Sequence, residues 1–297
     1  MSGAWTMRKA LFCLMGSVFA TLSLSLGGYL AWSKQNQKKL FDEKYKVISI
    51  MQTGPEKEAL KTTYLAELLG LSADRFISLY SIDVKQAEKK LLSSPLIKSA
   101  FVKRLPPSAI YIDYEVRKPV AMLADYKNTA IDAEGYLFPL TPFFSPKEIP
   151  EIYLGLPPFG ADADALGRHG GQWLIPLQNP LLNIAFDVLR FLEDVPWKEG
   201  FRVKRIDVSN ALAPSLGQRE IVVFTEEEWV ESSCVFPKIL RISPTDYAQQ
   251  LANFFVLRRN MEEAYRKQLS GIGTPTRFSA RIIDLRIPQL AFVQNQN

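Results

Sequence analysis

The 297-residue sequence has very little cysteine and histidine. It contains two cysteines and one histidine, and Cys13 lies inside a long apolar run, which leaves Cys234 as the only thiol outside that run. The part of the chain after the run therefore cannot form an internal disulfide, and no paired Cys/His spacing typical of zinc sites is present. Stability must come from a hydrophobic core, and a hydrophobic content of 47% is enough to build one.

Short motifs that mark common catalytic sites are also absent. There is no Gly-x-Ser-x-Gly elbow and no Walker phosphate loop. His169 lies in a Gly-rich stretch with no partner indicated by spacing, and Asp162 and Asp164 resemble the start of a calcium loop whose required Glu is replaced by Trp173. We therefore expect no enzyme activity, no cofactor and no bound metal, while carboxylates can still meet in space without leaving a sequence trace.

Positive charge is scarce outside the amino-terminal region. The formal net charge of the chain is +5, and residues 1–44 alone carry +4. The remaining chain is nearly neutral, whereas binding to nucleic acid needs a dense basic face. The basic excess lies where a membrane surface would be, so we expect no nucleic-acid partner.

The longest apolar run covers residues 10–32 and contains no charged residue. Its 23 residues are enough to span a bilayer as a helix, and Tyr29 and Trp32 lie where an interfacial aromatic belt is expected. A cleaved signal peptide is the alternative, because Ser25-Leu26-Gly27 offers small residues at a cut site, but the run exceeds the usual length of a signal core. We predict a retained transmembrane helix.

The orientation of this helix does not follow from charge alone. Two basic residues precede the span and five follow it, up to Lys46. The positive-inside rule taken alone would keep the large domain in the cytoplasm, but long domains translocate despite such charge.

The first 70 residues after the span predict a β-α-α-β-β order. A strand is expected over residues 45–53, and Gly54-Pro55 is expected to start a helix that ends at Gly70. Asp83 with Gln86 predicts the start of a second helix. Two alternating strands follow, with Ile110, Ile112, Tyr114 and Val116 on the buried face of the second.

The rest of the chain predicts a second α+β domain. A Pro- and Gly-rich passage over residues 142–180, whose part from 155 to 172 is expected to be a mobile loop, leads to a helix opened by Asn179-Pro180. Three strands, a long helix after Ser243-Pro244 and two final strands should follow. The acidic stretch TEEEW, residues 225–229, is interpreted as a solvated turn.

Several motifs in this order resemble the bacterial cell-division family FtsQ, called DivIB in some lineages. In that family a strand ending in Arg and Pro leads to a second strand, an Arg-x-Pro-Val-Ala exit and an Asp-x-x-Gly hairpin, and an Asp-Leu-Arg strand closes the second domain. The resemblance covers residues 10–140 well and 240–293 moderately. The matching positions are Arg104, Pro106, Arg117, Pro119, Val120, Ala121, Asp132 and Gly135.

The resemblance implies a single-pass protein of the bacterial inner membrane whose large part is periplasmic. It would act as a scaffold that recruits FtsB-like and FtsL-like bitopic coiled-coil proteins and helps to control septal peptidoglycan synthesis. The alternatives are a factor of protein export or outer-membrane assembly with a POTRA domain, and a cell-wall enzyme. The expected parts are a cytoplasmic tail (1–9), a transmembrane helix (10–32), a juxtamembrane linker (33–44), a POTRA domain (45–117) and a β-rich α+β domain (118–294).

The closing stretch ARIIDLRIPQLAFV, residues 280–293, is the predicted partner-binding site. Strict alternation puts Asp284 and Arg286 on one face, and Pro288 indicates a sheet edge because it cannot donate to a strand ladder. We expect a partner strand to pair beside residues 282–293, which is where the resembling family binds its coiled-coil partner. An Arg that only caps a solvated edge is the alternative. The expected contact residues are Asp284, Arg286, Ile287, Leu290, Phe292 and Val293.

Overall fold

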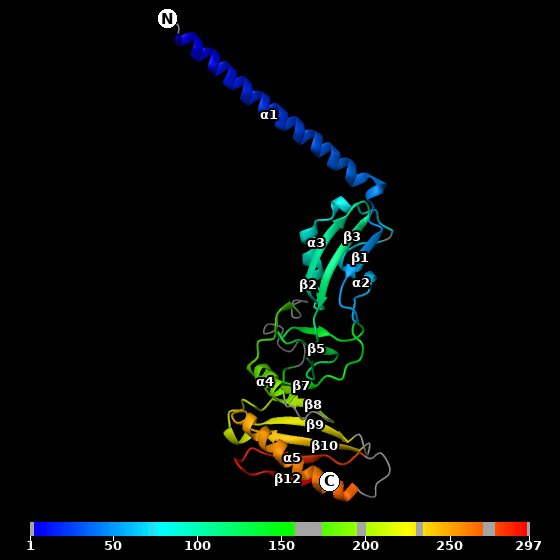
Figure 1. Cartoon of the computed structure of the whole chain (residues 1–297), viewed down its shortest axis with the longest axis vertical. Coiled ribbons are helices and arrows are strands. Elements are labelled where there is room, and N and C mark those ends of the chain that lie inside the picture. The colour runs from blue at the N-terminus through cyan, green and yellow to red at the C-terminus, as the bar shows by residue number, and fades with distance from the viewer. Residues whose placement is uncertain are drawn as a thin grey trace. The chain divides into compact units, whose positions relative to one another are not determined.

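The computed structural model describes the chain as two compact units, residues 1–116 and 117–297 (Figure 1). The described residues are 3–72, 74–157, 174–194, 200–229, 234–269 and 277–295. The predicted mobile loop falls almost entirely outside these ranges, as do the candidate residues Asp162, Asp164, His169 and Trp173. The α+β class is confirmed.

Helix α1, Gly3–Phe41, is longer than the sequence predicted. Its part Leu11–Phe41 is long and apolar enough to cross a membrane by length and composition. The segment 33–44, expected to be a linker, continues the helix to Phe41 and then forms the short 3-10 turn η1, Glu43–Tyr45, which Asp42 caps. The stretch has no Pro or Gly to end the helix earlier, so the helix continues beyond the apolar run.

The end of α1 is attached to the rest of the first unit. The Ser78 hydroxyl, which is buried, donates to the Lys39 carbonyl oxygen at 3.0 Å. The Lys39 ammonium lies 5.1 Å from the centre of the Tyr80 ring, and Tyr45 packs edge-on against the same ring at 5.0 Å. These contacts fix the last turn of the helix against the 3-10 turn η2, Leu79–Ser81.

A three-stranded sheet with two helices follows in the first unit, in the predicted β-α-α-β-β order. Strand β3 is central, parallel to β1 and antiparallel to β2. The alternation in β3 buries its four predicted apolar residues, which confirms that face. The elements are β1 (Ser49–Thr53), α2 (Thr62–Leu69), α3 (Val84–Leu92), β2 (Ile97–Leu105) and β3 (Ala109–Val116).

Two of the three predicted helix boundaries in this unit are confirmed. Gly70 ends α2 in the left-handed conformation at φ +70°, and the Asp83 carboxylate caps α3. The predicted start of α2 at Gly54-Pro55 is wrong. A Cβ at Gly54 would lie 2.7 Å from the Tyr114 ring, and the segment before α2 wraps that side chain, since Leu60 N donates to its hydroxyl at 2.8 Å.

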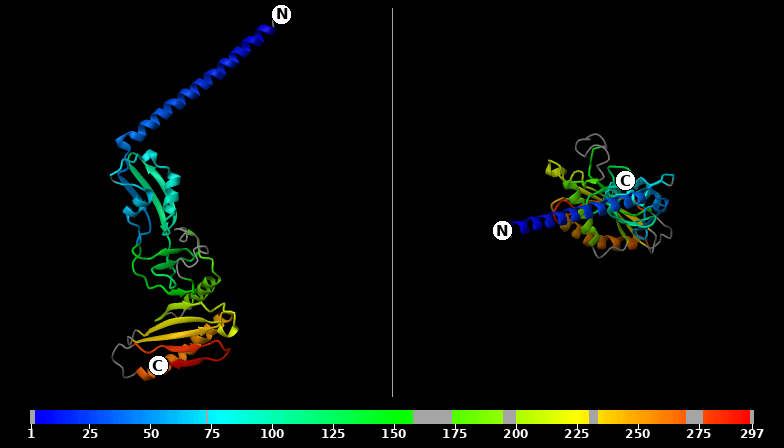
Figure 2. Two further views of the ribbon diagram at one scale, coloured as in Figure 1. Left: turned by 180° about the vertical axis from the view of Figure 1, so that it is seen from behind. Right: turned by 90° about the horizontal axis from the view of Figure 1, so that it is seen from above.

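The second unit is built on a nine-stranded mixed sheet (Figures 1 and 2). Its strand order is β12-β11-β10-β9-β8-β7-β4-β5-β6. The strands are β4 (Ala121–Leu123), β5 (Thr129–Ile131), β6 (Leu137–Pro139), β7 (Glu151–Tyr153), β8 (Phe201–Asp207), β9 (Ile221–Trp229), β10 (Cys234–Ile242), β11 (Arg281–Asp284) and β12 (Phe292–Asn295).

Two helices cover one face of this sheet. Helix α4, Pro180–Asp194, begins at the predicted Asn179-Pro180, and α5 runs over Tyr247–Leu269. Both pack into a single hydrophobic core with the inward residues of the strands, and Leu189, Phe254 and Ile283 are among its members. No described helix lies on the opposite face, so β8 to β12 present an uncovered surface there.

The hairpin predicted from Asp132 and Gly135 is confirmed. Gly135 has φ +87°, and the Asp132 carboxylate accepts hydrogen bonds from Glu134 N and Tyr136 N. Arg117 donates to the same carboxylate at 2.8 Å. The motif is therefore a structural turn that fixes the first residues of the second unit.

The interpretation of TEEEW as a solvated turn is wrong. These residues lie within β9, and its alternation continues through them, so that Thr225 and Glu227 are buried on the helix-covered face. The charge of Glu227 is accommodated because Lys238 and Arg258 form ion pairs with it.

Candidate partner-binding edge

Strand β12 is the outermost strand of the nine-stranded sheet and pairs antiparallel with β11. The sequence placed an external strand beside residues 282–293, but the chain's own β12 already covers β11. The chain reverses in the turn after β11, where Gln289 has φ +63° and Leu290 N donates to the Ile287 carbonyl. This turn is what brings β12 against β11. Among the described strands β12 has one partner, so its outer side is the edge that can accept a strand.

The backbone of β12 has a defined orientation. Leu285 N donates to the Arg241 carbonyl of β10 at 2.9 Å. Because successive residues of a strand point their backbone groups to opposite sides, the backbone N–H and C=O of Asp284 point toward β12. The backbone groups of its register partner Phe292 point back toward β11. The amide of the next residue, Val293, therefore points outward from the edge of the sheet. An incoming strand could accept a hydrogen bond from this donor.

Apolar side chains surround the open edge. Ile287 is 50% exposed, Leu290 56%, Phe292 56% and Val293 47%. Such a group of exposed apolar residues on an ordered element is typical of an interaction site. Four of the six predicted contact residues are therefore exposed, with Phe292 on the uncovered face of the sheet beside Asp284 and Val293 on the helix-covered face beside Ile283.

The other two predicted residues belong to an edge ionic cluster of Glu220, Arg241, Asp284 and Arg286. Arg286 donates from Nη2 to Asp284 at 2.8 Å, and its Nη1 lies 3.2 Å from Glu220. Arg241 lies between the same two carboxylates, at 2.6 Å from Glu220 and 3.5 Å from Asp284. The Arg286 guanidinium is thus already paired, and a partner carboxylate would have to compete with Asp284 for it.

The ionisation of this cluster is coupled to its geometry. Burial by itself raises the pKa of Asp284, but the hydrogen bonds from Arg286 and the charges of Arg286 and Arg241 outweigh it and lower that pKa. The hydrogen bond to Asp284 raises the pKa of Arg286. Both groups stay charged at neutral pH, and their charges largely cancel within the cluster.

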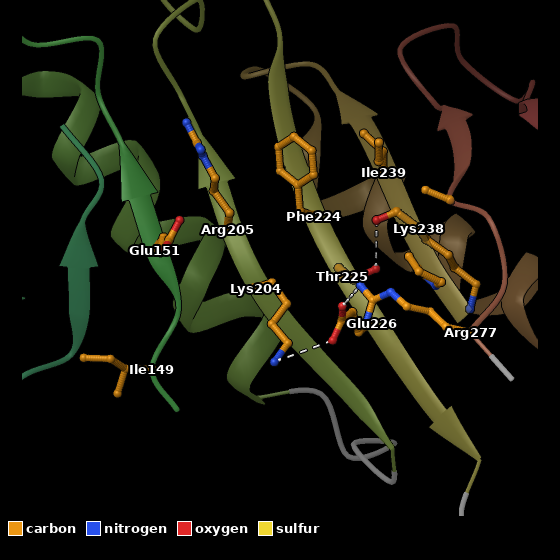
Figure 3. Close-up of a pocket in the computed structure, with 12 residues that line it drawn as sticks. Ile149, Glu151, Lys204, Arg205, Phe224, Thr225, Glu226, Lys238, Ile239 and Arg277 are labelled. Atoms are coloured by element: carbon orange, nitrogen blue, oxygen red, sulfur yellow. Dashed lines mark hydrogen bonds and ion pairs between the residues drawn. The ribbon is translucent and has the colours of Figure 1, made fainter. Parts of the chain in front are cut away.

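The uncovered face of the sheet continues inward from this edge. Ile239 of β10 lies between Phe224 of β9 and Ile282 of β11 in one cross-strand row. A shallow hollow of about 580 Å³ opens beside the row. Figure 3 shows Lys204 pointing toward Glu226 at this hollow, and their charged atoms are 3.6 Å apart. Glu226 there pairs with both Lys204 and Arg277, and Arg205 lies over the Tyr153 ring.

A second group of charges, missed from the sequence, lies on the helix-covered face. This buried ionic cluster consists of Glu227, Lys238 and Arg258. Arg258 of α5 donates to Glu227 at 2.8–2.9 Å, and Lys238 of β10 is paired with the same carboxylate. The period-two alternation of β9 is the signal that would have placed Glu227 inside.

No family model matches the chain, and a comparison with curated proteins gave no match. What the edge can bind therefore follows from its own geometry and from the motifs of the sequence. The geometry offers outward backbone donors, exposed apolar side chains and a neutralised ionic centre. Together they suit the addition of an extended, largely apolar segment of another protein.

Proposed function

We propose that this chain is a bitopic scaffold of bacterial cell division of the FtsQ/DivIB type. Helix α1 anchors it in the inner membrane, and the chain after α1 lies in the periplasm. The part of the first unit that follows α1 is a POTRA domain, and the second unit is the domain that captures partners. It recruits FtsB-like and FtsL-like coiled-coil proteins and through them influences septal peptidoglycan synthesis. The motifs from Arg104 to Gly135 and the order of elements support this proposal.

The observation that carries the proposal is the outer side of β12. Its Val293 amide points away from the sheet, and Phe292 beside it is exposed. Backbone hydrogen bonds of about 1 kcal/mol net each would hold an added strand, while apolar side chains would select it. An enzyme would need a cleft with convergent polar groups, whereas this edge is suited to binding a strand.

A backbone substitution tests the proposal most directly. Val293→Pro removes the outward donor and puts the proline ring where the added strand would lie, while the ladder from β12 to β11 stays intact. Capture of the FtsB-like protein from the same organism by the full-length chain in detergent should weaken about tenfold or more.

Val293→Thr is the matched control, because it keeps the amide and the β-branched shape of the side chain. It should bind within about twofold of the unchanged protein. Both variants should unfold at the same temperature within a few degrees. If Val293→Pro captures the partner as well as Val293→Thr does, strand addition at β12 is refuted.

A further inference from the structure

Arg205 of β8, on the uncovered face of the sheet, forms no ion pair with any carboxylate of the described residues. Its Nε is buried and lacks a hydrogen-bond partner among them. Glu151 is its register partner on β7 but is exposed and lies outside ion-pair distance. Asp207, two residues further along β8, instead accepts hydrogen bonds from the amide and hydroxyl of Ser209. A half-buried guanidinium without an acceptor is unusual in a fold and calls for an explanation.

A bulge in β8 puts Arg205 in this position. The pairing of β8 with β9 shifts between Val203 and Arg205, so Lys204 has no register partner on β9. Neighbours on a regular strand point to opposite faces, whereas Lys204 and Arg205 both line the hollow on the uncovered face. Figure 3 shows the two side chains extending in opposite directions along the strand. Bulges often re-aim a side chain in this way beside a binding site.

The Tyr153 ring holds Arg205 while leaving it without an oxygen acceptor. The guanidinium carbon lies 4.8 Å from the centre of that ring. An arginine carries five N–H donors in a planar fork, which matches the two oxygens of a carboxylate. The fold therefore orients a cation on this face and supplies no anion for it.

The middle of the hollow is apolar. Phe224 of β9 lies between Arg205 and Ile239 in the cross-strand row, and both apolar side chains are half-buried. Ile149 and Pro237 also line the hollow. Its volume of about 580 Å³ falls within the range of pockets that hold small molecules, on the order of 300–1,000 Å³.

The charges around the hollow suit a ligand with a single negative charge. Lys238 also borders it, but its ammonium is buried on the other face with Glu227. Three cations against two carboxylates leave one positive charge in excess, and the carboxylates would repel a second negative charge on the ligand. The charged side chains on this face are Lys204, Arg205, Arg277, Glu151 and Glu226.

The unpaired cation and the paired acidic group lie at opposite ends of the hollow. Arg205 reaches toward Tyr153, which is the register partner of Asp207 beyond it on β8. Glu226 is the register partner of Arg202, which precedes Arg205 on the same strand. A ligand with a carboxylate at one end and N–H donors further along, joined by small apolar groups, matches this arrangement. The end of a peptide chain has these features.

We propose that the hollow between β7 and β10 binds the end of a short peptide, with Arg205 as the bidentate contact of its free carboxylate. Phe224 and Ile239 pack against its small apolar side chains. The inference goes beyond the proposed function, because it concerns a second site on strands inward from β12. A protein chain ends in L-residues and a peptidoglycan stem peptide in D-residues, and both share this chemistry.

Matched peptides tested on the full-length chain in detergent examine the inference. The peptides are acetyl-Ala-Ala with a free carboxylate and the same compound as a carboxamide, each in the L and the D form. Ligand-observed NMR measures their dissociation constants. We expect the carboxylate of at least one form to bind in the millimolar range and its carboxamide to bind about tenfold more weakly, because the charge-assisted pair is lost.

Arg205→Gln should weaken binding of the carboxylate about tenfold and leave binding of the carboxamide unchanged. Arg202→Gln is the matched control, since Arg202 lies on the same strand and is paired at the surface with Glu148 and Glu228. It should bind the carboxylate within about twofold of the unchanged protein. Both variants should unfold at the same temperature within a few degrees.

The comparison of carboxylate with carboxamide uses the unchanged protein, so it does not depend on how a variant folds. Preference for the L form identifies the ligand as a protein terminus, and preference for the D form identifies it as a stem peptide. The site is refuted if carboxylate and carboxamide bind equally, if neither form binds at about 10 mM, or if Arg205→Gln binds the carboxylate as tightly as the unchanged protein does.

Discussion

The two ionic clusters of the second unit use similar residues on opposite faces of one sheet. The buried ionic cluster lies under α5, where Glu227 receives a cation from the neighbouring strand and another from the helix. The edge ionic cluster lies on the uncovered face, where each of its four side chains retains between 17% and 36% exposure. The first fixes the position of a helix, and the second neutralises a surface that other chains can approach.

The difference shows why charge alone does not indicate function. A buried pair is costly to break, because the remaining ion loses both water and partner. An exposed pair can be exchanged, since water screens it and replaces what is lost. Only the edge ionic cluster can therefore rearrange when a partner binds, and the following predictions test this contrast.

The largest effect is expected at the centre of the buried ionic cluster. Glu227→Gln leaves the ammonium of Lys238 and the guanidinium of Arg258 buried with a neutral neighbour, which should lower the free energy of unfolding by about 3–5 kcal/mol. Urea denaturation of the full chain in detergent measures it. Glu228→Gln, one residue further along β9 and paired with Arg202 at the surface, is the control and should change little. Equal losses of unfolding free energy in the two variants would show that the buried and the exposed glutamates of β9 do not differ in their contribution to stability.

A smaller, pH-dependent effect is expected at Asp284. Its pKa is lowered in the folded chain, so its contribution to stability is complete above the ordinary value of 3.8 and disappears as the pH falls through the lower folded value. Asp284→Asn should cost about 1–2 kcal/mol at pH 7. The difference from the unchanged protein should shrink below about pH 4. A difference that stays constant down to pH 2 would show that the carboxylate charge is not responsible.

The smallest effect is expected at Glu226 on the uncovered face. It pairs with Lys204 and Arg277, both of which are largely exposed. Glu226→Gln should change the free energy of unfolding by about 0.5 kcal/mol or less, and 1 M salt should remove the difference. A loss comparable with that of Glu227→Gln would mean that the two faces of β9 do not differ as described.

Much of the fold could be predicted because alternation and capping are local signals. The strand at Ala109–Val116 and the helix starts at Asp83 and Pro180 each depend on residues within a few positions of one another. The burial of Glu227 depends on Arg258, which lies 31 residues away. A run of three glutamates therefore suggested a solvated turn, since the charges that stabilise one of them are distant in sequence.

The sequence placed residues 282–293 at a sheet edge, and the structure divides this stretch between β11 and the outermost strand β12. Alternation puts Ile283, Leu285 and Ile287 on the face opposite Asp284 and Arg286; Ile283 and Leu285 are buried, whereas Ile287, which lies beyond the end of β11, is 50% exposed. It did not show that the chain turns at Gln289 and pairs β12 with β11, because that pairing is set by a turn whose positive φ falls on a non-Gly residue. Glu220 and Arg241, the remaining members of the edge ionic cluster, come from other strands and left no local pattern.

The continuity of α1 with the first unit has a mechanical consequence. The helix continues unbroken to Phe41, and its last turn is held by Ser78 and Tyr80. A helix transmits twist along its axis because its hydrogen bonds resist unwinding, whereas a loose tether would dissipate the twist within a few residues. Rotation of the apolar part of α1 about the helix axis would therefore be transmitted to the three-stranded sheet through these contacts.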